Sequence, residues 1–143
     1  MNIKIKYIDT TLPASTYQTE GSVAIDLYAR VDTVLKPRTP TLIPLNVVIK
    51  CPKDHFFLIT VRSSTAFKKG FTTANGIGVL DQDYCGDNDE ALLLAFNFTD
   101  NEITVKRGDR IAQGIFVKIS RPQKFDVVVS MNEKDRGGVG STG

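Results

Sequence analysis

The sequence has few of the residues that bind metals through sulfur or imidazole: it contains 2 cysteines and 1 histidine. Cys51, Cys85 and His55 do not have the spacing of a metal site. The cysteines are predicted to be reduced, small packing residues of an intracellular protein. A Cys–His dyad remains open as a nucleophile, although no neighbouring residue would orient it.

Long apolar runs and an excess of one charge are also missing. No stretch of 18 apolar residues occurs, and residues 1–6 alternate apolar and polar side chains, which argues against a signal peptide. Its 18 basic and 16 acidic residues leave a formal charge of +2 without a basic stripe. The sequence therefore predicts neither a membrane nor a nucleic-acid partner.

Helical periodicity is nearly absent, and short strand-like segments recur between turn residues. One short helix is expected over residues 63–69, and a single domain fits this length. The pattern predicts an all-β sandwich, jelly roll or barrel. The expected strands cover residues 3–8, 23–28, 41–49, 56–61, 92–98, 103–105, 111–119 and 125–129.

The first of three polar clusters is Arg62-Ser63-Ser64-Thr65, which directly follows the apolar strand of residues 56–61. A guanidinium, hydroxyls and backbone N–H groups at the start of a helix are suited to holding an anion. Ordinary helix capping by serine accounts for the same residues. Both interpretations stay open.

The second cluster spans residues 75–89 and contains glycines, four aspartates and Tyr84. Its small residues would let a flat ligand approach the backbone of a hairpin. Asp81 follows an apolar run, where desolvation would make it a general base. A simple polar turn is the alternative, and the spacing does not match a calcium-binding EF-hand loop.

The third cluster, residues 107–114, places Arg110 and Gln113 on a strand after a turn; a structural ion pair of Arg110 is the alternative to a ligand role. The chain then ends on a glycine-rich tail, residues 135–143. Its guanidinium, hydroxyls and exposed N–H groups suit phosphate oxygens. A frayed terminus is the competing interpretation.

Taken in order, five segments resemble the five motifs of the homotrimeric dUTP pyrophosphatase (dUTPase) family. They are residues 24–29, 61–64, 78–86, 108–113 and 136–143. The fourth, Gly-Asp-Arg-Ile-Ala-Gln, matches the family at every position. Agreement of five motifs in order makes chance similarity very unlikely.

The resemblance implies a β-clip-like jelly-roll subunit in a threefold trimer, with active sites at the subunit interfaces. Residues 1–130 would form the jelly-roll domain, and residues 131–143 a flexible arm that closes over a site. It also implies a cytoplasmic enzyme, of a bacterial or virus-infected cell, that hydrolyses dUTP to dUMP and pyrophosphate with Mg²⁺. The implied partners are dUTP and further copies of the chain.

By position in the motifs, Asp81 would activate the attacking water, and Asp26 would hold Mg²⁺ through water. Arg110 would be mainly structural. The remaining matched residues would bind substrate, through phosphates, base or sugar. They are Arg62, Ser63, Ser64, Asn75, Gly78, Val79, Leu80, Tyr84, Asp89, Gln113, Arg136, Gly140, Ser141 and Thr142.

The arm departs most from the family pattern: it is two residues shorter, and Val139 replaces an aromatic residue that stacks on the base. Ile25, Val61 and Cys85 also differ from the usual residues. Two other functions remain open. One is a regulatory or binding protein on the same scaffold, although Asp81 is present. The other is a dCTP deaminase, which the tyrosine and the complete arm argue against.

Overall fold

The computed structural model describes residues 2–138, and nearly all of its regular structure is β-strand. Every strand pair is antiparallel, which confirms the predicted all-β class. The strands are β1 (Lys4–Tyr7), β2 (Ile25–Tyr28), β3 (Thr33–Leu35), β4 (Pro40–Pro44), β5 (Val47–Lys50), β6 (His55–Val61), β7 (Phe71–Thr73), β8 (Gly78–Leu80), β9 (Leu92–Asn97), β10 (Ile103–Val105) and β11 (Arg110–Lys118).

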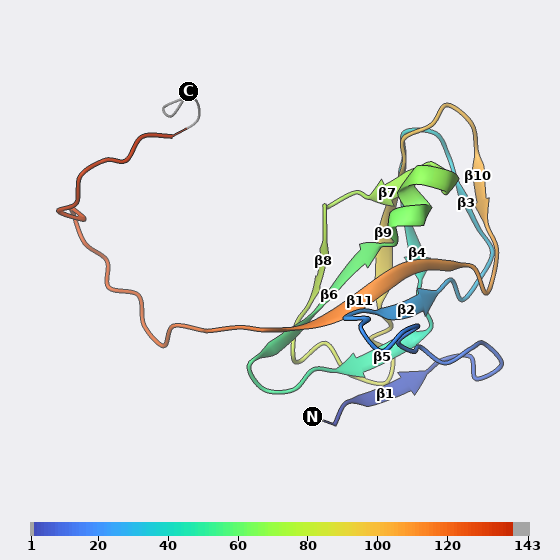
Figure 1. Ribbon diagram of the computed structural model, residues 1–143, viewed down its shortest axis with the longest axis horizontal. Coiled ribbons are helices and arrows are strands. Elements are labelled where there is room, and N and C mark those ends of the chain that lie inside the picture. Colours follow the sequence, from blue (N-terminus) through green and yellow to red (C-terminus); the bar gives the residue numbers. More distant parts are fainter. Residues whose placement is uncertain (1, 139–143) are drawn as a thin grey trace.

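Two larger sheets and two short strand pairs form a jelly-roll body (Figure 1). One sheet has the order β2-β11-β6-β8, and the other the order β4-β9-β7. The pairs β1-β5 and β3-β10 complete the body. Among the described residues, no helix is long and apolar enough to cross a membrane.

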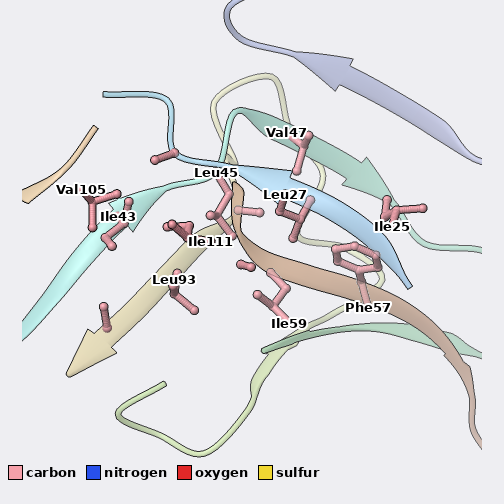
Figure 2. Packing of buried hydrophobic residues seen from close by; sticks show 14 of the residues in the cluster. Ile25, Leu27, Ile43, Leu45, Val47, Phe57, Ile59, Leu93, Val105 and Ile111 are labelled. Atoms are coloured by element: carbon pink, nitrogen blue, oxygen red, sulfur yellow. The ribbon is translucent and has the colours of Figure 1, made fainter. Parts of the chain in front are cut away.

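The core forms where the inner faces of these sheets meet (Figure 2). Alternate residues of β6 and β9 are buried: Phe57 and Ile59 in the first, Leu93 and Ala95 in the second. This alternation is expected where one sheet face lies against the core. Cys51 joins the same cluster and both cysteines are free, as predicted.

Gly114 lets β11 and β6 approach closely. It is buried opposite Ile59, and a β-carbon built on it would collide with the ring of Phe57. That ring also meets Phe116, with ring centroids 4.8 Å apart and planes inclined by 47°. An aromatic side chain therefore fills the space that the glycine leaves.

The strand expected over residues 41–49 is interrupted and forms β4 and β5. Asn46 causes the break, because its φ of 68° is a left-handed conformation that strands do not adopt. Its side-chain oxygen accepts a 2.7 Å hydrogen bond from the Asp9 N–H. Its own N–H donates to Glu90 Oε1 at 2.8 Å.

The helix expected over residues 63–69 forms one turn of π-helix, η1 (Thr65–Lys69), which ends at Gly70 with a φ of 78°. Three strands were not among those expected: β3, β7 and β8. Each has only three residues, and pairing with β10, β9 and β6 respectively defines them. The local sequence of such short strands carries little signal, because their stability comes from the partner strand.

The strand expected over residues 125–129 is not present. After β11 the chain leaves the body and residues 120–138 are exposed, with no helix or strand (Figure 1). Phe125 and Val127 retain 80% and 97% of their exposure. The prediction was wrong for the single subunit because a strand needs a neighbour, and this segment has none among residues 2–138.

Candidate functional site

Asp26, Arg62, Arg110 and Gln113 lie together and are called here the phosphate-side cluster. Asp26 on β2 is directly opposite Gln113 on β11. Arg62 follows the last residue of β6, the strand on the other side of β11. Three neighbouring strands therefore bring side chains from three distant segments to one place.

The Asp26 carboxylate is the centre of this cluster. One oxygen, Oδ1, lies 2.9 Å from Arg62 Nε, and the other, Oδ2, lies 3.1 Å from Arg110 Nη1. Only 6% of the Asp26 side chain is exposed, against 26% for Arg62 and 38% for Arg110. Two guanidinium groups share one carboxylate, so the cluster carries a net positive charge that favours an anion.

A hollow of about 390 Å³ opens at this cluster. Gln113 borders it, and its Nε2 donates a weak 3.4 Å hydrogen bond to the Val61 carbonyl. The hollow is completed by the segment that leads into β2. Its lining residues are Gln18, Thr19, Gly21, Ser22, Val23, Ala24, Asp26, Arg62 and Gln113.

The two serines of the first polar cluster lie beside Arg62. Ser63 is exposed, and Ser64 is the residue before η1 but makes no capping hydrogen bond with its side chain. Capping therefore does not explain Ser64. The buried Thr65, the last residue of that cluster, donates its hydroxyl to the Ile111 carbonyl at 2.8 Å and fixes this loop to β11.

A second hollow, of about 180 Å³, lies beside β8 and is called here the base-side hollow. Its lining residues are Val79, Leu80, Asp81, Tyr84 and Leu92. Four of them were predicted to be functional, whereas Leu92 was not. Leu92 gave no signal in the sequence, because an apolar residue that begins a strand is expected to be core.

The turn after β8 holds the hollow's polar residues. The Tyr84 N–H donates to the Asp81 carbonyl at 3.3 Å, and the Tyr84 hydroxyl donates to the Glu90 carbonyl at 3.2 Å. The carboxylate of Asp89 accepts a 2.6 Å hydrogen bond from the Gly86 N–H. Asp89 thus stabilises the turn, while Asn75 lies in the tight turn before β8 and does not line the hollow.

Asp81 itself is exposed, and its carboxylate makes no ion pair with any residue between positions 2 and 138. The expectation of a desolvated carboxylate is therefore not met within one subunit. The alternative catalytic dyad also lacks support. Cys51 is buried in the core, and His55 Nδ1 lies 3.0 Å from the carbonyl oxygen of Lys53.

One subunit does not bring these two sites together. Leu80, which precedes Asp81, pairs with Phe57 near the beginning of β6, whereas Arg62 follows the end of that strand. At about 3.4 Å per residue, the two points are roughly 17 Å apart along the strand. Asp81 borders the base-side hollow and Arg62 borders the hollow of the phosphate-side cluster, so neither hollow holds both residues.

The described residues contain no group of three or more histidine, cysteine, aspartate or glutamate residues that could hold a metal. Asp26 is the single carboxylate of the phosphate-side cluster, and both of its oxygens contact arginines. Such a donor set fits Mg²⁺ only where water and substrate phosphates supply the other ligands, which is the usual manner of magnesium binding.

The described part of the arm, residues 131–138, lines neither hollow. Arg136 is exposed on the segment that extends from the body. Gly140, Ser141 and Thr142, together with Val139, lie outside the described residues.

The chain is similar to known proteins over nearly all of its length. The dUTPase family profile matches residues 10–143. A deoxyuridine 5'-triphosphate nucleotidohydrolase of Brucella melitensis is 37% identical over 92% of this chain and 84% of its own. A prophage-derived enzyme of the same name from Bacillus subtilis is 37% identical over 100% and 99%. The dUTPase of Staphylococcus bacteriophage 80alpha, solved with dUPNHPP, has a TM-score of 0.84 at 20% identity over 99% and 98%.

Proposed function

We propose that this chain, which belongs to the dUTPase family, hydrolyses dUTP to dUMP and pyrophosphate. The observation that carries the proposal is the division of its polar residues into two sets. A positively charged cluster fits a triphosphate, and a small, mainly apolar hollow with one carboxylate fits a base and sugar. Binding of a nucleoside triphosphate requires both a site for the phosphates and a site for the base and sugar.

In the proposed reaction, Asp81 accepts a proton from a water molecule as that water attacks the α-phosphorus. The bond between the α-phosphorus and the bridging oxygen breaks, and pyrophosphate leaves. Arg62, Ser63, Ser64 and Gln113 bind the phosphate oxygens. Arg110 holds Asp26 in place, which agrees with the structural role expected of it and with its 3.1 Å ion pair.

Magnesium is the proposed cofactor, held by Asp26 through water and by the substrate's phosphates. When bound, it supplies positive charge that neutralises the departing pyrophosphate. The protein's own charges would neutralise the pyrophosphate only in part, because Asp26 already offsets one of the two nearby guanidinium charges.

Base and sugar selection is assigned to the base-side hollow. Backbone groups of Gly78, Val79 and Leu80 would bind the polar edge of uracil, with Asn75 and Asp89 at its margin. Cytosine has the opposite donor and acceptor pattern, so it would leave buried polar groups unpaired. The ring of Tyr84 would lie under the deoxyribose and exclude a 2′-hydroxyl.

We infer a trimer, the assembly that the family resemblance implies, and the separation of the two half-sites supports a site shared between subunits. Because Asp81 and Arg62 lie at opposite ends of β6, a complete site would take the base-side hollow from one subunit and the phosphate-side cluster from a second. The exposed segment between β11 and the arm supports this interpretation. Its apolar residues Phe125 and Val127 are exposed in the single subunit, and a neighbouring subunit would bury them.

The arm would add Arg136, Gly140, Ser141 and Thr142 to the phosphates of a neighbouring site. Removal of residues 136–143 is expected to lower turnover about 100-fold, because several phosphate contacts that strengthen in the transition state are lost together. The melting temperature should stay unchanged, since the described part of this segment is exposed. Unaltered turnover would exclude the arm from catalysis.

Substrate choice is tested by measuring pyrophosphate release from dUTP, dCTP, dTTP and UTP with Mg²⁺, alongside the native mass. We expect a trimer that acts almost only on dUTP. Equal rates with dUTP and dCTP would contradict the proposed selectivity. Release of ammonia from dCTP would identify a deaminase, and a stable trimer with no turnover would favour a regulatory or binding protein.

The shared site has a sharper test. Asp81→Asn and Arg62→Gln should each inactivate the homotrimer, because each variant damages every site. Unfolding and refolding an equal mixture should restore about a quarter of the wild-type sites, since two intact half-sites then meet by chance. Absence of recovery in verified mixed trimers would place both residues in one subunit's site.

A further inference from the structure

The two cysteines of the chain lie in turns that meet at one end of the body. Cys51 directly follows β5 and belongs to the buried core. Cys85 lies in the turn after β8 and is half-buried. Both thiols are free, and neither has a role in the proposed reaction. Their positions raise the question of whether they act as a pair.

The segment between Cys85 and β9 is held along β5 by two contacts. The Ala91 N–H donates to the carbonyl of Val47, the first residue of β5, at 2.8 Å. Lys6, which lies opposite the second residue of β5, donates through Nζ to the Asp87 carbonyl at 2.9 Å and to its Oδ1 at 3.0 Å. The segment therefore leads back along β5, and Cys85 lies toward the end of the strand where the other cysteine follows.

The turn before β6 approaches the same place from the other side. It begins at Cys51, and the His55 N–H donates to the Pro52 carbonyl at 3.2 Å. His55 borders a hollow that it shares with Asp83, from the turn after β8. The Cys85 N–H donates to the Asp83 carbonyl at 3.0 Å. Contacts on both sides thus bring the two cysteine-bearing turns together.

The two thiols are close enough to interact electrostatically. Burial raises the pKa of the Cys51 thiol, and the nearby Cys85 raises it further. Cys51 is therefore protonated at neutral pH and covered by the core. The half-buried Cys85 is the thiol that an oxidant in solution reaches first.

We propose that Cys51 and Cys85 are a redox-sensitive pair, whose closure to an intramolecular disulfide distorts the base-side hollow. The Cys85 thiolate attacks one sulfur of a low-molecular-weight disulfide such as oxidised glutathione, and one glutathione leaves as a thiol. The Cys51 thiol then gives its proton to water and attacks the Cys85 sulfur, which releases the second glutathione. The two protein thiols lose two electrons and two protons, and the oxidant is reduced to two thiols.

Closure would move the turn, because Cys51 is packed among the strands of the core. A disulfide requires the two β-carbons to lie within about 4.5 Å of each other. Tyr84, directly before Cys85, is held by hydrogen bonds of 3.3 Å and 3.2 Å, which are long enough to break readily. Since Tyr84 borders the base-side hollow, the bridge would impair hydrolysis of dUTP. This last step rests on the proposed function.

The test exposes the native protein to excess oxidised glutathione and compares the wild type with Cys85→Ser and Cys51→Ala. Free thiols, intact mass and migration in non-reducing denaturing electrophoresis report on the bridge. Turnover of dUTP with Mg²⁺ is measured before oxidation, after it, and again after reduction with dithiothreitol. Cys85→Ser changes a half-buried position, so it keeps the test valid even if the core variant does not fold.

The wild type should lose both thiols and the mass of two hydrogen atoms, carry no glutathione, and migrate as a single chain. Its turnover should fall about tenfold and return on reduction, because small displacements of positioning residues slow the reaction strongly. Cys85→Ser should keep the Cys51 thiol and the turnover of the reduced wild type. Cys51→Ala should stop at a glutathione adduct on Cys85, since no second thiol can displace it.

Several results would overturn the inference. A glutathione adduct that persists on the wild type, a disulfide between chains, or two thiols that stay free would each show that Cys51 and Cys85 are no pair. A closed bridge with unchanged turnover would show that the pair does not control the site. If the bridge forms but the reduced wild type does not hydrolyse dUTP, the proposed function fails while the thiol pair stands.

Discussion

The phosphate-side cluster and the base-side hollow are built in different ways. The first is formed by side chains on paired strands, with Asp26 opposite Gln113 and two arginines on one buried carboxylate. The second is formed by a short strand and the turn after it, where Asp81 is exposed and makes no ion pair with the described residues. The first region is held by charge and register, and the second by backbone turns.

The two regions should therefore differ in how much their residues contribute to the stability of the fold and to the reaction. A residue whose charges are fully paired contributes to folding and must exchange partners before it binds substrate. A residue that is exposed and unpaired contributes little to folding and is free to react. We therefore expect mutations in the base-side hollow to change activity alone, and mutations in the phosphate-side cluster to change stability as well.

The largest effect is expected from Asp81→Asn. An amide cannot accept the proton of the attacking water, so turnover of dUTP should fall about 1,000-fold or more while dUTP still binds. The melting temperature should not change, because the exposed carboxylate has no ion-pair partner in residues 2–138. Steady-state kinetics and a thermal melt on the same sample measure both quantities.

Asp83→Asn is the matched control, since Asp83 is another exposed aspartate two positions along the same turn. Its turnover should stay close to that of the wild type. An equal loss in both variants would mean that the net charge of the turn matters and that Asp81 is not the general base.

Gly114→Ala tests the scaffold that joins the two regions. The added methyl would collide with the Phe57 ring between β11 and β6, and overpacking of this kind should cost about 3 kcal/mol of unfolding free energy. Denaturant unfolding measures the loss. Adding Phe57→Leu should recover part of it, because the smaller side chain makes room for the methyl. No recovery would mean that another contact causes the destabilisation.

The sequence placed Asp26 and Gln113 in the strands expected over residues 23–28 and 111–119, and the pairing of β2 with β11 brings the two residues together. Their grouping in one site was implied only by the family resemblance, because register is set by tertiary pairing. The structural ion pair that was the alternative role of Arg110 is present. Its partner is Asp26, while the neighbouring acid Asp109 pairs with Lys69. Partner choice depends on tertiary contacts that the local sequence does not contain.

The base-side hollow was predicted in part, and its gaps have physical causes. Leu92 lines the hollow because side chains alternate along the strand, and its neighbours Ala91 and Leu93 are buried in the core. A shift of the strand by one residue would reverse which side chains face the core. Asp81 was expected to be desolvated, but among residues 2–138 nothing covers it and its side chain is exposed. The segment of residues 125–129 was expected to be a strand, but it pairs with no strand among residues 2–138.

A smaller effect is expected from Asp26→Asn, which leaves Arg62 and Arg110 without their shared carboxylate. Losing two charged hydrogen-bond contacts at a buried position should cost about 2 kcal/mol of unfolding free energy. Asp100→Asn is the control, because Asp100 and its partner Arg38 are both largely exposed. The control should lose at most about 0.5 kcal/mol. Equal losses in denaturant unfolding would contradict the structural role assigned to the cluster.

The smallest effect concerns Asp9, next to the turn that leads into β11 and the phosphate-side cluster. Hydrogen bonds from Thr11 and Arg107 lower the pKa of Asp9 from 3.8 to about 2. Because the folded pKa lies below the unfolded one, ionised Asp9 stabilises the fold above about pH 4, and this contribution is lost as the pH falls toward 2. Asp9→Asn should therefore lower the melting temperature slightly at pH 6, and the difference from the wild type should shrink between pH 4 and pH 2. A difference that stays constant over that range would show that shape, not charge, is what Asp9 contributes.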